Sequence, residues 1–112
     1  MGQKGKYGER YDMPRGWKTR SPYRERIYNI WKQMWKRVYT TPNDFGRIIH
    51  PSFKYFSKFF QWFKTLDNFE EFCNSCSSTK WSIHIDNGIN RNFYPESMSV
   101  ILVGTNSKRK CL

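Results

Sequence analysis

The sequence has few cysteines and no long apolar run, and each absence narrows the class of protein. Three cysteines among 112 residues do not make the disulfide framework of a small secreted domain. No apolar run is long enough to cross a membrane, and the basic N-terminus lacks the hydrophobic segment of a signal peptide. We therefore expect a protein of a reducing, intracellular compartment that does not bind a membrane.

Acidic residues are also few. Lys and Arg number 20 against 9 Asp and Glu, which gives a net charge of +11. Residues 1–40 carry +8 of this charge, whereas residues 41–80 carry +1 and residues 81–112 carry +2. A generally basic protein is the simpler explanation, but the clustering of charge favours nucleic acid as a partner.

Aliphatic side chains are scarce, whereas aromatic residues make up 19% of the chain. Phe and Trp must therefore build most of the core, and a length of 112 residues predicts one domain with a single modest core. Rings that remain at the surface can stack on a base or fill a partner's pocket.

Residues 1–20 predict a basic arm. They contain four glycines and no hydrophobic periodicity, so the segment alone in water should be mobile. Its expected anchors, on the protein's own body or on a partner, are Tyr7, Tyr11 and Trp17. Basic arms commonly settle against phosphate. The candidate phosphate-binding residues of the arm are Lys4, Lys6, Arg10, Arg15, Lys18 and Arg20.

The Ser-Pro pair at 21–22 predicts the start of a helix that continues to about Tyr39, with Ser as N-cap and Pro in the first turn. Three-and-four spacing gives the helix one apolar stripe, formed by Ile27, Ile30, Trp31, Met34 and Val38. Arg24, Lys32 and Lys36 lie away from this stripe. We expect them to extend the cationic surface of the arm.

The remaining segments predict an α+β fold. Residues 47–50 predict a short extended piece, residues 52–66 an aromatic core helix, and residues 67–78 a short acidic helix. Residues 81–86 and 97–103 predict the two strands of a C-terminal β-hairpin. We expect two to three helices packed on this small antiparallel sheet. The predicted division is the basic N-terminal arm 1–20, a single α+β domain 21–108 and a basic tail 109–112.

The hairpin also collects polar residues. Strand alternation puts His84 and Asp86 on the same face, close to an Asn-rich turn. Such a set is typical of a metal-dependent nuclease hairpin, with His84 as general base, Asp86 as metal ligand and Asn90 or Asn92 as orienting residue. A surface or structural histidine is the simpler alternative.

Several stretches follow the pattern of one protein family. The C-terminal stretches are Trp81, the Ile-His-Ile-Asp run at 83–86, the Asn-Gly turn at 87–88, Phe-Tyr-Pro-Glu at 93–96, the strand at 100–103 and Asn106. The upstream positions are Tyr28, Trp31, Met34, Arg37 and Tyr39, followed by Phe53, Phe56, Phe59 and Phe63. On these positions, the chain resembles phage-encoded HNH homing-endonuclease-like DNA-binding proteins across residues 21–108.

The resemblance implies a DNA-binding scaffold in the cytoplasm of an infected bacterial host, with Arg47 on a strand that contacts DNA. The catalytic set is incomplete, because Ile83 stands where the family has an Asp and no second His follows the second strand. We therefore expect nucleic-acid binding without cleavage and without a cofactor. One alternative is an active HNH-like nuclease, which would need a divalent metal. Another is a phage inhibitor of a host nucleic-acid enzyme or defence complex, whose partner is a host protein or ribonucleoprotein.

Two smaller features remain open. Cys73 and Cys76 have the spacing of a zinc or redox pair. Zinc would need two more ligands, and the candidates are His50, His84 and Cys111. Free thiols are the simpler interpretation. The tail adds a phosphate contact or a solubilising end through Lys108, Arg109 and Lys110.

Overall fold

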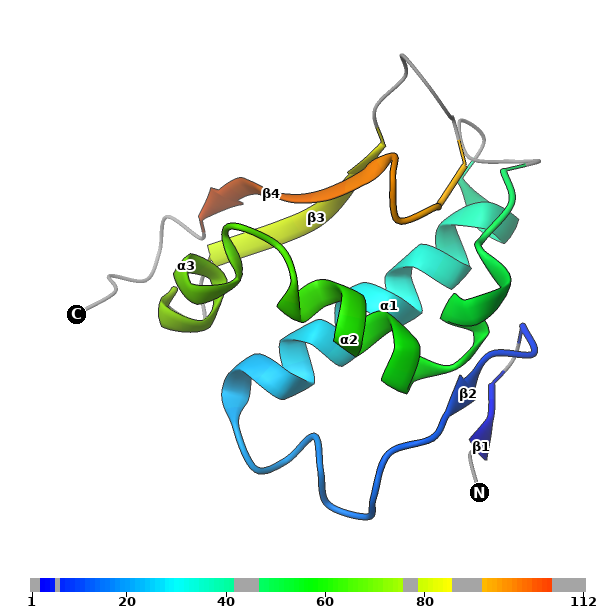
Figure 1. The fold of residues 1–112 in the computed structure, drawn as a ribbon, viewed down its shortest axis with the longest axis horizontal. Helices are drawn as coiled ribbons and strands as arrows, with labels where there is room; N and C mark the ends of the chain where they lie inside the picture. The colour runs from blue at the N-terminus through cyan, green and yellow to red at the C-terminus, as the bar shows by residue number, and fades with distance from the viewer. Residues whose placement is uncertain (1–2, 6, 42–46, 76–78, 86–91, 106–112) are drawn as a thin grey trace.

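The computed structural model describes residues 3–5, 7–41, 47–75, 79–85 and 92–105 (Figure 1). In chain order the elements are β1 (Gln3–Lys4), β2 (Arg10–Tyr11), α1 (Pro22–Thr40), the 3-10 helix η2 (Pro51–Lys54), α2 (Phe56–Lys64), α3 (Phe69–Asn74), β3 (Thr79–Ile85) and β4 (Met98–Thr105). The predicted α+β class is confirmed. Within the described ranges, no helix is both long enough and apolar enough to cross a membrane.

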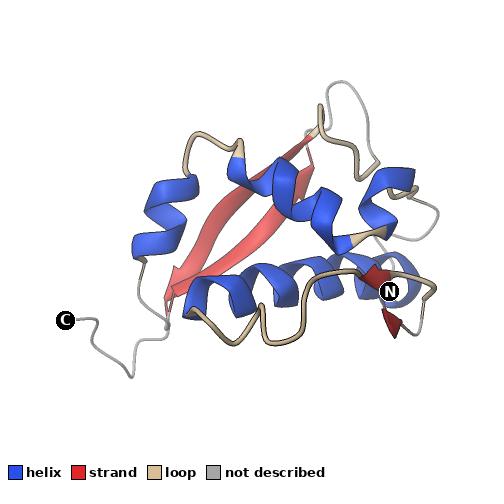
Figure 2. Ribbon diagram, turned by 60° about the horizontal axis from the view of Figure 1, so that its bottom comes forward, coloured by secondary structure: helices blue, strands red, loops and turns tan. Residues whose placement is uncertain are grey.

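The β3–β4 hairpin covers the helices. Figures 1 and 2 show α1 and α2 on one side of the hairpin, with α3 beside one of its ends. The strands pair antiparallel, with Ile83 opposite Val100 and His84 opposite Ser99. Alternation buries Ile83 and Val100 against the helices, and it leaves His84 and Ser99 exposed on the outer face.

Aromatic rings fill most of the core, as the composition predicts. The fully buried rings, each at most 1% exposed, are Trp31, Phe53, Phe56, Phe59, Phe63, Phe72 and Phe93. The indole N–H of Trp31 donates to the carbonyl of Phe53 over 2.8 Å, so its polar atom is satisfied inside the core.

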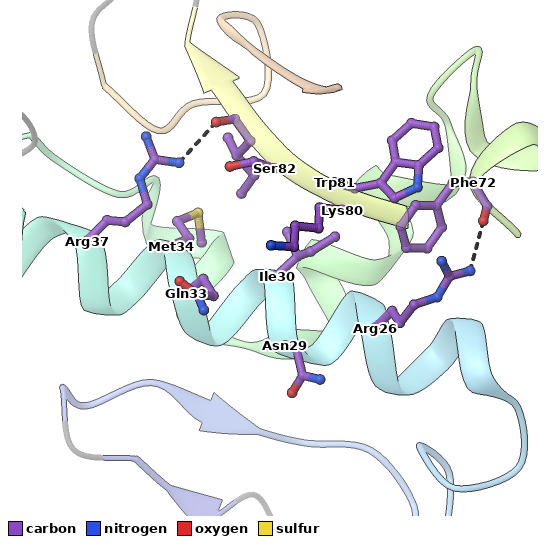
Figure 3. A pocket seen from close by; sticks show the side chains of 11 residues that line it. Arg26, Asn29, Ile30, Gln33, Met34, Arg37, Phe72, Lys80, Trp81 and Ser82 are labelled. Atoms are coloured by element: carbon purple, nitrogen blue, oxygen red, sulfur yellow. Dashed lines mark hydrogen bonds between the residues drawn. The ribbon is translucent and has the colours of Figure 1, made fainter. Parts of the chain in front are cut away.

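Side chains from the helices close both edges of the two-stranded sheet. Arg37 of α1 donates to the carbonyl of Ile83 over 3.0 Å, and Asn68 donates to the carbonyl of Val100 over 2.7 Å. In an antiparallel ladder, alternate pairs turn these carbonyls away from the partner strand, where they need another donor. Arg26 at the other end of α1 donates to the carbonyl of Phe72 over 2.9 Å, which joins α1 to α3 (Figure 3).

The predicted helix over residues 52–66 is interrupted. Tyr55 has an extended backbone (φ −102°, ψ 123°) and separates η2 from α2. Its backbone forms an isolated parallel bridge with Arg10 of the arm. The side chain of Tyr55 does not cap α2. Instead, the carboxylate of Asp12 accepts from the N–H of Ser57 over 2.8 Å and from its hydroxyl over 2.6 Å.

The arm is not the structureless segment that its composition predicts. Residues 3–4 and 10–11 pair as a small antiparallel hairpin, and Trp17 is buried, with 8% of its surface exposed. Tyr7 stacks on Tyr39 with ring centroids 4.7 Å apart, and Tyr11 makes an edge contact with a ring of α1. The three expected anchors therefore hold the arm on the protein's own body.

Two local predictions also differ from the structure. The helix starts at Pro22 as expected, but the side chain of Ser21 makes no capping hydrogen bond. The extended piece over residues 47–50 is reduced to one isolated bridge between Ile49 and Phe93. Arg47 precedes this bridge and is half-buried, so the predicted strand-borne position for it is not formed.

We predict that Asp12→Ala lowers the stability of the whole domain. The substitution removes the acceptor for the first turn of α2, a loss that costs about 1 kcal/mol for a helix cap. The urea midpoint of unfolding should fall accordingly. The matched control is Asp67→Ala, which removes an exposed carboxylate and should change the midpoint little. Equal midpoints for Asp12→Ala and the wild type would contradict the role of Asp12.

Candidate nucleic-acid interface

The arm lies along α1 in the opposite direction. Its contacts, in the order of the arm, are Tyr7 on Tyr39, Glu9 on Lys32, Tyr11 on Tyr28, and Trp17 with Arg24. The arm therefore packs on the side of α1 that carries Arg24 and Lys32. The arm and this side of α1 contact each other, and Lys32 is paired with Glu9 in this contact.

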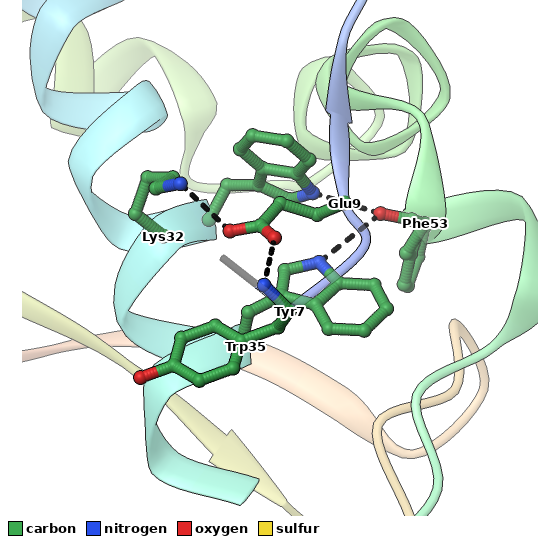
Figure 4. Close-up of polar contacts among 6 residues, drawn as sticks. Tyr7, Glu9, Lys32, Trp35 and Phe53 are labelled. Carbon is green, nitrogen blue, oxygen red and sulfur yellow. Dashed lines mark hydrogen bonds and ion pairs between the residues drawn. The ribbon is translucent and has the colours of Figure 1, made fainter. Parts of the chain in front are cut away.

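Glu9 is the buried centre of this contact. Its carboxylate is 1% exposed and lies 2.7 Å from the ammonium of Lys32, and its other oxygen accepts from the N–H of Tyr7 over 2.9 Å (Figure 4). Burial alone would raise the pKa of Glu9, but the hydrogen bonds from Lys32 and from backbone N–H groups outweigh it and hold the pKa below its ordinary value. A methyl group at Gly5 would overlap this carboxylate, so a larger residue there would displace the side chain of Glu9.

The other predicted cations of the arm and α1 occupy different surroundings. Arg10 is half-buried in β2, whereas Lys36 is exposed near the C-terminal end of α1. Lys4 lies in β1. The predicted contacts at Lys6, Lys108, Arg109 and Lys110 lie outside the described residues.

Three cations lie over aromatic rings where the arm enters α1, and the exposed Arg15 and Arg20 belong to the same stretch of the arm. Lys18 lies over the ring of Tyr28 at 3.9 Å, and Arg24 lies over that of Trp17 at 4.9 Å. Trp17 also packs against Phe60 of α2, whose ring lies 5.0 Å from the ammonium of Lys64. We call this region the basic–aromatic surface; it consists of the cations Arg15, Lys18, Arg20, Arg24 and Lys64 and the rings Tyr11, Trp17, Tyr28 and Phe60.

This surface keeps its positive charge within the described part of the chain. Among the described residues, none of its five cations forms an ion pair with a carboxylate. Arg15, Arg20 and Lys64 are exposed, and Lys18 and Arg24 are half-buried. The nearby acids of the arm are used elsewhere, because Glu9 binds Lys32 and Asp12 binds the start of α2. The surface therefore has the charge and the exposed cations that a polyanion requires.

Sequence reasoning identifies four of these cations but misses Lys64. The segment around it is assigned to the core because of its phenylalanine stripe. A signal is present in the sequence, since Lys58, Gln61 and Lys64 recur every three residues, and all three are exposed in α2. Such spacing marks a polar side of the helix next to the apolar one.

Only part of the candidate nuclease set is described by the structure. His84 is exposed on the outer face of β3, opposite Ser99, whereas Asp86 and Asn90 lie outside the described residues. Ile83 is 5% exposed and belongs to the core. In the described ranges, no three His, Cys, Asp or Glu side chains are grouped to hold a metal ion.

The candidate zinc ligands are only partly described. Cys76 and Cys111 lie outside the described residues. Cys73 is half-buried in α3, and burial raises the pKa of its thiol. The Nδ1 atom of His50 accepts from the N–H of Ser52 over 3.2 Å and thereby caps η2. His50 therefore has a structural role as the start of a helix.

We predict that the Glu9–Lys32 pair stabilises the protein in a pH-dependent way. The folded-state pKa of Glu9 lies below the ordinary value of 4.5, so its stabilisation is fully present above that pH. The stabilisation is lost as the pH falls through the folded-state pKa. Because Lys32 is half-exposed, we expect Glu9→Gln to lower the free energy of unfolding by about 1–2 kcal/mol at pH 7.

Urea unfolding at pH 7 and pH 3 tests this prediction. The difference between the wild type and Glu9→Gln should shrink at pH 3, because the wild-type carboxylate is then largely protonated in the unfolded chain and must lose this proton to pair with Lys32 in the folded protein. Glu96→Gln, which removes an exposed carboxylate, serves as the control. An equal loss of stability at both pH values would show that Glu9 acts through packing rather than charge.

Known proteins do not indicate the function of this chain. Comparison with family models, with curated proteins and with solved structures found no match. The resemblance to HNH homing-endonuclease-like proteins stays a prediction. The basic–aromatic surface is therefore the feature from which a function is inferred.

Proposed function

We propose that this protein binds nucleic acid through the basic–aromatic surface. The observation that carries the proposal is a set of three cations over rings of the arm, α1 and α2, together with exposed Arg15 and Arg20 in the same stretch of the arm. None of the five pairs with a described carboxylate. Phosphate groups supply the charge that this surface lacks. Binding of this kind depends on the backbone and not on the base sequence.

The cations and the aromatic rings of this surface have different roles in binding. Exposed Arg15, Arg20 and Lys64 can reach phosphates, because no described carboxylate forms an ion pair with any of them. Lys64 also lies over the ring of Phe60. Lys18 and Arg24 are held over rings, which fixes where their charge lies. The half-buried ring of Phe60 adds an apolar contact for sugar or base.

The folded arm makes this surface available before binding. Trp17 is buried against Phe56 and Phe60, and its carbonyl accepts from the N–H of Arg20 over 3.3 Å. The loop that carries Arg15, Lys18 and Arg20 is therefore attached at its centre. Binding does not have to order a free arm first, so less conformational entropy is lost.

We predict that neutralising two exposed cations of the surface weakens binding to duplex DNA. Each phosphate contact contributes about 0.9 to the slope of log affinity against log salt concentration. The double variant Arg20→Gln/Lys64→Gln should lower that slope by about 1.8 and weaken binding about tenfold near 0.1 M salt. Fluorescence anisotropy of a labelled duplex across a salt series measures both quantities.

The matched control is the double variant Lys36→Gln/Lys54→Gln. It removes the same charge from two exposed positions outside the basic–aromatic surface, on α1 and η2. This control should change affinity less than about twofold. Equal effects of the two double variants would show that net charge, and not this surface, determines binding. The same reactions with Mg²⁺ or Mn²⁺, run on a gel, reveal whether the duplex is also nicked.

A further inference from the structure

A second region with recognition chemistry lies on the other side of α1. A groove of about 420 Å³ runs between α1 and β3 (Figure 3). Small-molecule sites have volumes of about 300–1,000 Å³, so the groove is large enough for a ligand of that class. It is separate from the basic–aromatic surface, because no residue of that surface lines it.

One part of the lining is apolar and aromatic. Ile30, Met34 and Ile83 are buried side chains that line it. Phe72 and Trp81 form an aromatic end, with ring centroids 5.3 Å apart and planes at 74°. Figure 3 shows this pair near Arg26, at the opposite end from Arg37.

The aromatic end is fixed by a small hydrogen-bond network. The hydroxyl of Ser75 accepts from the indole N–H of Trp81 over 3.1 Å and from Arg26 over 2.9 Å, and it donates to the carbonyl of Phe72 over 2.6 Å. These three bonds use the hydroxyl fully. Trp81 is therefore oriented by the protein and presents a positioned ring rather than a mobile one.

The remaining lining residues are cations and neutral polar groups. Asn29, Gln33 and Ser82 offer both donors and acceptors, and exposed Lys80 adds a positive charge. Arg26 and Arg37 are used in bonds to backbone carbonyls, yet they keep their charge at the two ends of the groove. Among the described lining residues there is no Asp or Glu.

We propose that this groove binds one nucleotide unit, with the base near Trp81 and the neutral polar side chains, and the phosphate at Lys80. The flat heteroaromatic base matches the aromatic end of the groove, and the donors and acceptors at its edge match the amide side chains. The negative charge of the phosphate matches the ammonium of Lys80. The unit is a free nucleotide or an unpaired nucleotide of a strand. In the second form the inference rests on the proposed function.

An acidic peptide is the competing ligand, and the structure disfavours it. A peptide strand added to the free edge of β3 would need the outward carbonyl of Ile83. Arg37 already donates to this carbonyl over 3.0 Å, so the added strand would lose a ladder bond or displace the arginine. A nucleotide needs no backbone group of β3.

Titration with a nucleoside monophosphate, followed by NMR of backbone amides, tests the proposal. Gln33→Trp places a large ring in the groove from an exposed position on α1, and it should weaken binding at least about tenfold. Lys80→Gln should weaken binding roughly five- to tenfold, because it removes the phosphate contact. The matched controls are Gln61→Trp and Lys36→Gln, both exposed and outside the groove, which should change affinity less than about twofold.

Two further measurements distinguish the possible outcomes of this experiment. Inorganic phosphate that competes as well as the nucleotide, or a nucleotide that does not bind, would overturn the inference. The second measurement is the binding of oligothymidylate to the wild type and to Gln33→Trp. If Gln33→Trp weakens this binding, the groove accepts an unpaired nucleotide of a strand. Duplex DNA has no unpaired base, so its binding tests only the basic–aromatic surface. A failure of the proposed function would therefore appear as a loss of duplex binding, independently of the nucleotide titration. Gln33→Trp should therefore leave duplex affinity unchanged.

Discussion

The structure depends on how aromatic rings pack around Phe56. Its side chain is fully buried, and ring centroids within 6.4 Å come from three parts of the chain, namely Tyr11, Trp17, Tyr28, Trp31, Phe59 and Phe60. Two of these rings belong to the arm and two to α1. Ring pairs prefer offset-stacked or edge-to-face arrangements, so their packing fixes orientation as well as distance. A chain with few aliphatic side chains thus uses its arm to complete its core.

The folded arm also decides which charges reach the surface. Its two acids turn inward, since Glu9 binds Lys32 and Asp12 caps α2. The cations between Asp12 and α1 are left without carboxylate partners in the described part of the chain. Folding therefore converts a modest local excess of positive charge into an uncompensated surface. This is the physical basis for proposing that the partner is a polyanion.

Local patterns were sufficient to predict the long helix and the C-terminal hairpin. The apolar stripe of α1 and the alternation of β3 depend on neighbours three to four or two residues away, which a sequence displays directly. The break at Tyr55 was not predictable in this way. It depends on Arg10 and Asp12, which lie about 45 residues earlier in the chain and meet it only in the folded protein.

The difference between local patterns and long-range contacts also decides how much of the candidate site could be predicted. Charge clustering pointed to the part of the chain that contributes most cations of the basic–aromatic surface, but it could not show that Lys32 is neutralised by Glu9. It also could not bring Lys64 beside Trp17, because their proximity is created by the packing of Phe60. The groove between α1 and β3 is likewise a product of tertiary structure, since its residues come from separate segments.

The central claim is that the arm is folded before any partner binds, so that the basic–aromatic surface is preformed. Hydrogen–deuterium exchange of the free protein tests it most directly. Peptides covering residues 7–20 should exchange at least about tenfold more slowly than an unfolded chain, and duplex DNA should add little protection. Exchange at the unfolded rate in the free protein, with protection only after DNA is added, would contradict the account.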